Sequence, residues 1–318
     1  MAATQRDVNP FPYSDSNKRY YTYDYYLRKK FGVKAVKIPL DAGFSCPHIK
    51  KDGFGCTFCS QRGSGDTVPE LPSLREQYDA GRRALSSKWD TSVTLAYLQA
   101  HTNTFAPRPA LERVYDEVLS FPGVRGLNIA TRADCLPPDV LDLLAGVSEK
   151  TALTVELGLQ SSNDVTAGRI HRGHTFACFL RGFGDLRERV PKAEICVHLI
   201  FGLPGEDADM MMKTVSDTAS LEPDQVKIHL LHVLDGTPLA DEWRRGGYVP
   251  LTKEAYVSAV CTALTLLPPR TVIARLTGDG LPGSLLAPLW SRKKVSVIND
   301  IDKKLYSEGL YQGCRFTG

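Results

Sequence analysis

Three cysteines near the N-terminus are the residues whose type and spacing are best suited to chemistry: Cys46, Cys56 and Cys59. They follow the spacing C-x9-C-x2-C, which places three thiolates on one loop. A cluster with four irons is usually held by four cysteine thiolates, so three thiolates leave one iron open to a small molecule. The loop therefore indicates a redox centre that binds a further ligand at an open iron.

Two other interpretations of this loop stay open from spacing alone. A structural zinc site needs four protein ligands, and His48 is the closest candidate to complete one. The loop is also compatible with reduced cysteines that bind no metal.

The composition is that of a globular protein. The 318 residues are 42% hydrophobic and 24% charged with a net charge of +3, which fits one large core or at most two domains. The eight cysteines form no regular disulfide pattern. Residues 1–12 lack the apolar core of a signal peptide, and no apolar run reaches the ~18 residues of a membrane span. We therefore expect a reduced, cytoplasmic setting without a membrane partner.

Basic and aromatic residues are concentrated in the first 40 positions. Eight Lys and Arg stand there against three Asp, together with six Tyr. Such a mixture can follow a phosphate backbone and stack on bases, although Tyr rings also pack on protein cores. Most of the Tyr rings of residues 1–34, a basic Tyr-rich N-terminal extension, are expected to pack on the barrel, and Arg28, Lys29 and Lys30 are the better candidates for contact with RNA phosphates.

Alternating strands and helices are predicted to position these residues. Strands are expected at 35–40, 92–99, 124–130, 151–159, 194–201 and 225–233, with helices at 109–120, from 138, at 176–190 and at 207–221. Such alternation predicts parallel βα units and an incomplete (β/α)6 barrel over residues 35–240. Residues 241–318 are expected to form a C-terminal extension with helices at 253–267 and 293–310, a strand at 271–277 and a loop at 281–290.

Several longer motifs give the chain a family resemblance over residues 35–240. The chain resembles the radical SAM superfamily and looks most like its YhcC/YtqA-type subfamily, which is related to the Elongator catalytic subunit and the anaerobic coproporphyrinogen oxidases. The resemblance rests on the cysteine loop and on YLQAHTNTFAP, ATRADCLP, ELGLQSSNDVTAGRIHRGHT, HLIFGLPGE and KIHLLHVLDGT. It implies a TIM-like α/β partial barrel with a [4Fe–4S] cluster on loop 46–59.

The same resemblance implies a mechanism and a second cofactor, S-adenosylmethionine (SAM). A reduced cluster passes one electron to SAM, which splits into methionine and a radical that abstracts hydrogen from the substrate. The resemblance assigns Cys46, Cys56 and Cys59 as cluster ligands. The residue before the last cysteine is usually aromatic in this superfamily and packs near the adenine, and Phe58 stands there.

The remaining SAM contacts follow from the resemblance at strand ends. Gln160 ends the fourth strand where relatives touch SAM, and Arg172 matches an Arg on the SAM carboxylate, for which a planar guanidinium is suited. Ile200 and Gly202 match positions near the adenine.

Two positions depart from the common superfamily pattern. Gln99 and the five residues after it replace the Gly-Gly-Glu that commonly binds the SAM amine. His198 stands where some relatives have an Asp that contacts the ribose.

Two further buried positions have alternative interpretations. Glu156 is expected to be a buried ion-pair partner, with Arg132 as one candidate partner. Cys135 is either a buried thiol or a hydrogen-atom donor to a substrate radical.

The resemblance and the basic segment favour a tRNA-modifying enzyme. The subfamily is associated with wobble-uridine maturation, in which a carboxymethylaminomethyl group becomes an aminomethyl group. Two alternatives stay open: a radical SAM enzyme that acts on a small molecule, and a noncatalytic zinc protein. The mechanism also requires an electron donor such as flavodoxin or ferredoxin.

Overall fold

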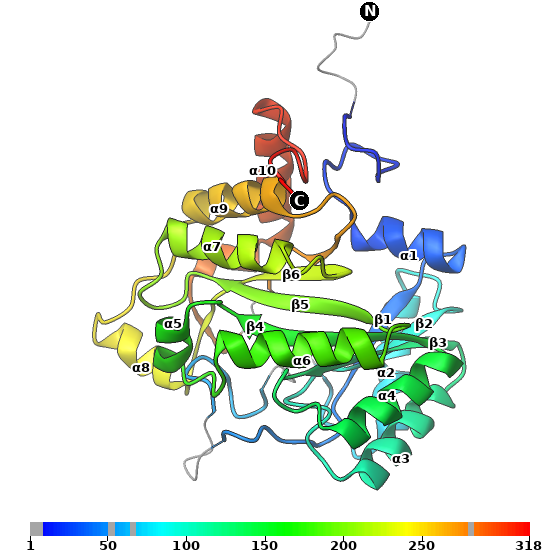
Figure 1. Cartoon of the computed structure of the whole chain (residues 1–318). Coiled ribbons are helices and arrows are strands. Elements are labelled where there is room, and N and C mark those ends of the chain that lie inside the picture. The colour runs from blue at the N-terminus through cyan, green and yellow to red at the C-terminus, as the bar shows by residue number, and fades with distance from the viewer. Residues whose placement is uncertain (1–8, 50–54, 64–67, 279–282) are drawn as a thin grey trace, which may run out of the picture. The chain divides into compact units, whose positions relative to one another are not determined.

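The computed structural model describes residues 9–49, 55–63, 68–278 and 283–318. Its main sheet has seven strands in the order β1-β2-β3-β4-β5-β6-β8 (Figure 1). The pairs β1–β2, β2–β3, β3–β4 and β6–β8 are parallel. Sequential parallel strands joined by helices are the topology of a partial (β/α) barrel, so the predicted fold class is confirmed. In the described residues no helix is long and apolar enough to cross a membrane.

The chain divides into two compact units. The cysteine unit comprises Leu27–Leu159 and Ala167–Cys196, and the carboxyl unit comprises Gln160–Thr166, Val197–Gly318 and the described part of Met1–Tyr26. Strand β5 contributes residues to both units.

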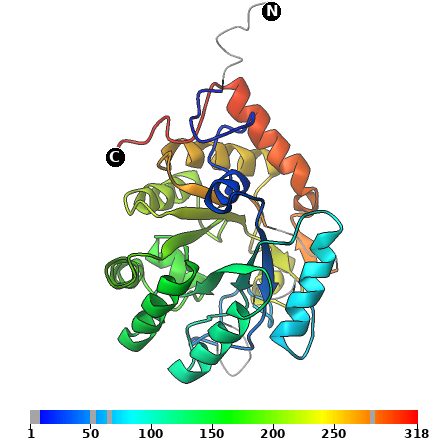
Figure 2. The ribbon, with the colours of Figure 1, turned by 90° about the vertical axis from the view of Figure 1, so that its right-hand side faces the viewer.

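The cysteine unit contains the first four strands and the helices that follow them. Its elements are α1 (Tyr23–Phe31, shared with the carboxyl unit), β1 (Val36–Leu40), α2 (Leu74–Ser86), β2 (Thr94–Leu98), α3 (Arg108–Leu119), β3 (Val124–Thr131), α4 (Pro138–Lys150), β4 (Ala152–Gln160), α6 (Phe176–Arg189) and the start of β5 (Glu194–Phe201). All five residues of β2 are buried, as expected for a parallel strand covered on both faces. Helices α3 and α4 pack against each other beside the sheet (Figure 2).

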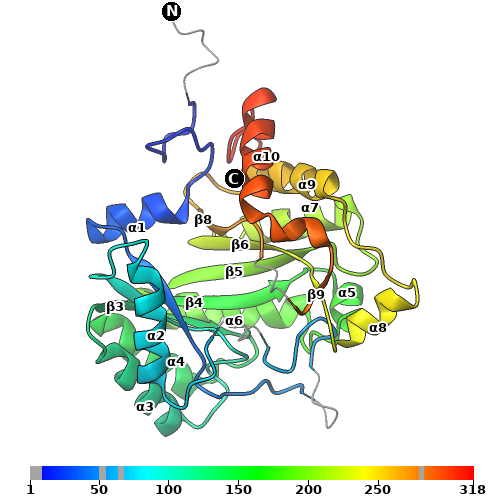
Figure 3. The same cartoon turned by 180° about the vertical axis from the view of Figure 1, so that it is seen from behind.

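The carboxyl unit contains strands β6 and β8 of the main sheet and a separate two-stranded antiparallel sheet. Its elements are the start of α5 (Asp164–Arg169), α7 (Ala208–Ala219), β6 (Gln225–Leu230), β7 (Val233–Leu234), α8 (Pro238–Arg244), α9 (Lys253–Leu266), β8 (Val272–Arg275), β9 (Leu285–Ala287), the 3-10 helix η2 (Leu289–Arg292) and α10 (Lys294–Ser307). Helices α9 and α10 pack together, and β9 pairs antiparallel with β7 (Figure 3).

The structure corrects two of the predicted elements. The strand expected at 225–233 ends at Leu230, and a separate short strand, β7, follows it. The loop expected at 281–290 is wrong for Leu285–Ala287, which form β9, whereas residues 281–282 lie outside the described residues.

One glycine fixes how the loop after β3 lies against a helix. A Cβ on Gly182 in α6 would come within 2.1 Å of the Ala133 carbonyl oxygen, so only glycine permits this approach. The contact sets α6 directly against the loop that carries Arg132 and Cys135.

Candidate functional site

The structure brings the three predicted cysteine ligands together in the cysteine unit. The Cys56 and Cys59 thiols are hydrogen-bonded to each other, and each is close enough to Cys46 for mutual electrostatic influence. The loop is held in place because the Thr57 N–H donates to the Ile170 carbonyl over 3.0 Å.

The environment favours a thiolate at Cys56 alone, because the hydrogen bond to Cys56 and burial raise the pKa of Cys59 well above its ordinary value. The hydrogen bond from Cys59 lowers the pKa of Cys56 well below its ordinary value, with a further contribution from His48. Burial raises the pKa of Cys46, whereas its contact with Thr102 opposes the rise. The Thr102 Oγ1 lies 3.1 Å from the Cys46 Sγ, so a deprotonated Cys46 accepts this hydrogen bond.

His48 lies beside Cys56 in the described part of the loop. Its Nε2 lies 3.3 Å from the Cys56 Sγ, and the Arg132 Nη1 lies 2.7 Å from its Nδ1 and 3.4 Å from its Nε2, over the face of the ring. Neither contact selects which ring nitrogen carries the proton. The described residues of the loop offer three thiolates, and this donor set fits an iron–sulfur cluster with an open iron.

Arg172 carries positive charge to this site. Its guanidinium is buried and lowers the pKa of Cys56, although less than the contacts of that thiol with Cys59 and His48 do. The Nε and Nη2 groups donate to the Gly158 carbonyl at the end of β4, Nε over 3.1 Å. Within the described residues Arg172 pairs with no carboxylate, and its other N–H groups can bind an anion.

Asn103 is a candidate that the sequence reasoning missed. It lies in the segment after β2 that begins at Gln99, whose own N–H donates to the Leu40 carbonyl over 3.2 Å. The Asn103 Nδ2 donates to the carbonyls of Ala100 at 2.9 Å and Ala130 at 3.1 Å, which fixes the orientation of the amide. Its buried Oδ1 has no hydrogen-bond partner among the described residues. The sequence marked the six-residue segment from Gln99 but not this position within it, because the orphan oxygen is visible only in the fold.

The carboxyl unit carries four of the predicted SAM contacts. Gln160 has a φ of 74°, and its buried Oε1 has no partner in the described part of the chain. Ile200 is buried, and the His198 ring lies 5.4 Å from that of His229. Gly202 has a φ of 83°, and its carbonyl accepts a hydrogen bond from the Tyr248 hydroxyl over 2.7 Å.

Cys135 follows β3 in the cysteine unit. Burial and the charge of Asp134 raise the pKa of its thiol to about 12, so the sulfur keeps its proton at neutral pH. Phe58 is half-buried between Cys56 and Cys59.

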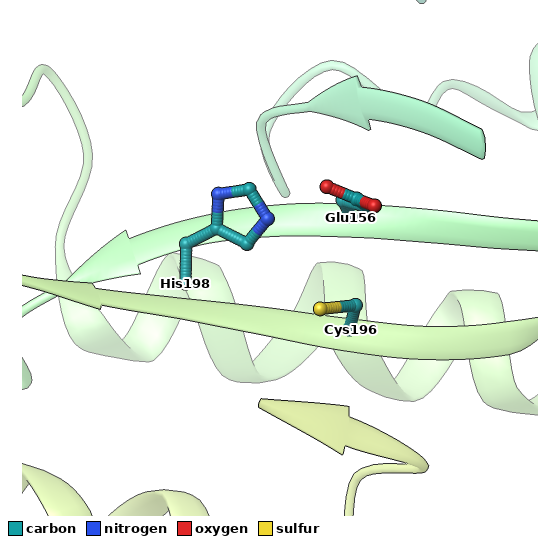
Figure 4. Close-up of side chains that lie close together, drawn as sticks. All are labelled: Glu156, Cys196 and His198. Carbon is teal, nitrogen blue, oxygen red and sulfur yellow. The ribbon is translucent and has the colours of Figure 1, made fainter. Parts of the chain in front are cut away.

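Glu156 is an ion-pair partner, as expected, but the expected partner is wrong. Its Oε1 accepts from the Lys37 Nζ at 2.8 Å and from the Asn128 Nδ2 at 3.3 Å, whereas Arg132 pairs with Asp134. Figure 4 shows Glu156 on β4 and Cys196 on β5, whose possible ligand atoms lie within 4.8 Å of each other. Because Lys37 already neutralises the carboxylate, this pair does not need a cation.

The three basic residues predicted to contact RNA form the last turn of α1. Arg28, Lys29 and Lys30 are consecutive there, and the Lys30 Nζ lies 2.5 Å from the Glu194 Oε1. Part of the positive charge of this turn is therefore offset by an ion pair.

Comparison with known sequences identifies two matching families. The family described as "Radical SAM superfamily" matches residues 53–218, and the family described as "Radical_SAM C-terminal domain" matches residues 223–307. Protein YtqA of Bacillus subtilis is 44% identical over 310 residues, which are 96% of this chain and 95% of YtqA. Protein YhcC of Escherichia coli is 34% identical over 289 residues, 89% of this chain and 91% of YhcC.

More distant similarities extend to a tRNA-modifying enzyme and to an archaeal Elp3. A tRNA uridine(34) acetyltransferase of Methanocaldococcus jannaschii is 30% identical over 164 residues, which are 50% of this chain and 29% of that protein. The solved structure of the archaeal Elp3 of Methanocaldococcus infernus, lacking its N-terminus, has a TM-score of 0.66 at 17% identity and covers 87% of this chain and 64% of that chain. At that identity the structure supports the fold alone.

Proposed function

This chain belongs to the radical SAM superfamily, and we propose that it modifies tRNA at the wobble uridine, converting a carboxymethylaminomethyl group to an aminomethyl group. The similarity that carries the proposal is the one to a tRNA uridine(34) acetyltransferase, together with the similarity to Elongator complex protein 3 of Schizosaccharomyces pombe, which is 25% identical over 80% of this chain and 53% of that protein. Superfamily members use a [4Fe–4S] cluster and SAM, which when bound supply a radical that abstracts hydrogen from the substrate.

The residues proposed to hold the cluster offer thiolates, whereas those proposed to hold SAM offer polar groups. Cys46, Cys56 and Cys59 offer three thiolates, and Arg172 offers guanidinium N–H groups for the SAM carboxylate. We add Asn103, since its fixed amide presents a buried, unsatisfied oxygen that suits an ammonium group.

The adenosine part of SAM would be bound by the other predicted positions. Gln160 presents a second buried amide oxygen without a described partner, Ile200 offers a buried apolar side chain, and Gly202 offers a turn of backbone with a positive φ. Phe58 supplies a ring for stacking. His198 remains the proposed substitute for a ribose-binding Asp, and Gln99 begins the segment proposed to receive the amine.

Cys135 is the proposed donor of a hydrogen atom to the substrate. Its high pKa keeps the S–H bond intact at neutral pH, as such a donor requires.

Arg28, Lys29 and Lys30 are proposed to contact tRNA phosphates, within an N-terminal extension of residues 1–34 that precedes the core at 35–240 and the C-terminal extension at 241–318. A flavodoxin or ferredoxin is the proposed electron donor.

Modified nucleosides from a strain lacking the gene test this function directly. The strain should accumulate carboxymethylaminomethyl-uridine and lose aminomethyl-uridine in its tRNA. Complementation with the wild-type gene should restore the parent pattern, whereas Cys56→Ala should not. An unchanged nucleoside profile would contradict the tRNA assignment and favour a small-molecule substrate.

A further inference from the structure

The His48 side chain lies beside the cysteines in a space that two glycines leave open. A Cβ added at Gly55 would lie 2.8 Å from the His48 Nε2, and one at Gly173 would lie 3.1 Å from the His48 Cβ. Gly173 also has a φ of 83°, which favours glycine. The backbone therefore leaves space for the imidazole at two separate places.

Arg132 lies over the face of that imidazole. Its Nη1 lies 2.7 Å from Nδ1 and 3.4 Å from Nε2, and these two distances place it above the ring rather than along the lone pair of either nitrogen. The contact packs the guanidinium on the ring and does not select a tautomer. The Nε2 faces the Cys56 Sγ at 3.3 Å, and a ligating thiolate carries no proton, so a hydrogen bond between them needs a proton on Nε2.

Arg132 is itself held on its other sides. Its Nε donates to the Asp134 Oδ1 at 2.8 Å, and its Nη2 donates to the Asp134 Oδ2 at 2.7 Å. Its Nη1 also donates to the Arg172 carbonyl at 2.6 Å. A bidentate pair with a carboxylate orients the guanidinium plane, so Asp134 helps to hold Arg132 against the His48 ring.

We propose that His48, packed against Arg132, donates a hydrogen bond to the Cys56 thiolate and thereby raises the reduction potential of the cluster. A proton donor on a ligand sulfur withdraws electron density and stabilises the reduced, more negative cluster. His48 acts through Cys56, so it is a positioning and tuning residue rather than a ligand. The inference rests on ligation of the cluster by the three cysteines.

Redox titration of the anaerobically reconstituted protein, followed by electron paramagnetic resonance, measures the predicted effect. His48→Leu should keep the iron content of the wild type but shift the equilibrium toward the oxidised cluster by about tenfold, which for one electron is about 59 mV. His48→Gln, whose amide can still offer an N–H to the sulfur, should retain most of the wild-type potential.

The outcomes of these measurements separate the possible roles of His48. An unchanged potential in His48→Leu with full iron content would overturn the proposal. Loss of iron in that variant would also overturn it, because His48 would then be required as a ligand or for assembly. Absence of iron in the wild-type protein would instead mean that the three-cysteine cluster itself is wrong.

A measurement on the wild-type protein avoids any folding defect of the variants. With ¹⁵N-labelled histidine, pulsed electron paramagnetic resonance should detect a weak nitrogen coupling to the reduced cluster, as a hydrogen bond through sulfur produces. A strong coupling typical of direct ligation, or no coupling at all, would contradict the proposal.

Discussion

Replacing Arg172 by lysine should weaken SAM binding because the structure divides the guanidinium between two tasks. The Nε and Nη2 groups both donate to the Gly158 carbonyl. Of the five N–H groups of an arginine, three then remain to meet a carboxylate. A lysine keeps the charge but concentrates its donors on one nitrogen, which cannot serve both partners with the same geometry.

The expected magnitude follows from the loss of one charge-assisted hydrogen bond. Such a bond contributes about 1.5–3 kcal/mol, which corresponds to a rise of about 10- to 160-fold in the dissociation constant of SAM. Equilibrium dialysis of labelled SAM against the reconstituted protein measures this constant directly. Iron content and the circular dichroism spectrum should stay at wild-type values.

Arg169→Lys is the matched control for this experiment. Arg169 is exposed at the end of α5, three residues before Arg172, and the same chemical change there should leave SAM affinity unaltered. Wild-type SAM affinity in Arg172→Lys with full iron content would refute the assignment of Arg172 to the carboxylate.

Three further predictions concern stability, pH and RNA. Glu156→Ala should destabilise the fold by about 1–3 kcal/mol in chemical denaturation, because it removes the buried carboxylate that pairs with the half-buried Lys37 ammonium. Glu149→Ala, which breaks an exposed pair with Lys192, should cost below ~1 kcal/mol, and equal costs would contradict the argument. Burial and the charge of Arg172 lower the pKa of His174 to about 4, so the unfolded chain binds a proton near pH 6.5 that the folded chain refuses, and stability should fall as pH drops from 6.5 toward 4. The melting temperature of His174→Asn should change less with pH between 6.5 and 4 than that of the wild type. An equally steep change would show that His174 is not the responsible group. Charge reversal of Arg28, Lys29 and Lys30 should weaken tRNA binding and make the affinity for tRNA less dependent on salt concentration, while leaving SAM binding intact. Equal tRNA affinities of the wild type and the variant would mean that this turn contacts no phosphate.

The strands of the sheet were predictable because parallel strands are buried on both faces and read as short apolar runs. The strand expected at 194–201 has those bounds in the structure, and those expected at 124–130 and 151–159 differ by a residue at their ends. Helix α2 was missed although its signal was present. Ser73 and Glu76 form a capping box in which the Ser73 Oγ accepts from the Glu76 N–H at 3.2 Å.

Other features have no local signal. Strand β9 exists because it pairs with β7, some fifty positions earlier in the chain, and neither is long enough to be recognised alone. The cysteine ligands could be proposed from spacing because they share one loop. His48 and Arg132 stand 84 positions apart, so their contact could not be read from the sequence.

Anaerobic reconstitution tests the central claim, that three cysteines hold a cluster with an open iron. Wild-type protein should bind about four irons and cleave SAM when reduced. In the wild type, addition of SAM should change the Mössbauer signal of one iron only, because only one lacks a thiolate. Cys56→Ala should lose both cluster and cleavage, while Cys314→Ala, which removes a cysteine from the C-terminal segment, should retain them. Retained SAM cleavage in Cys56→Ala, or a cluster whose four irons all ignore SAM, would contradict the account.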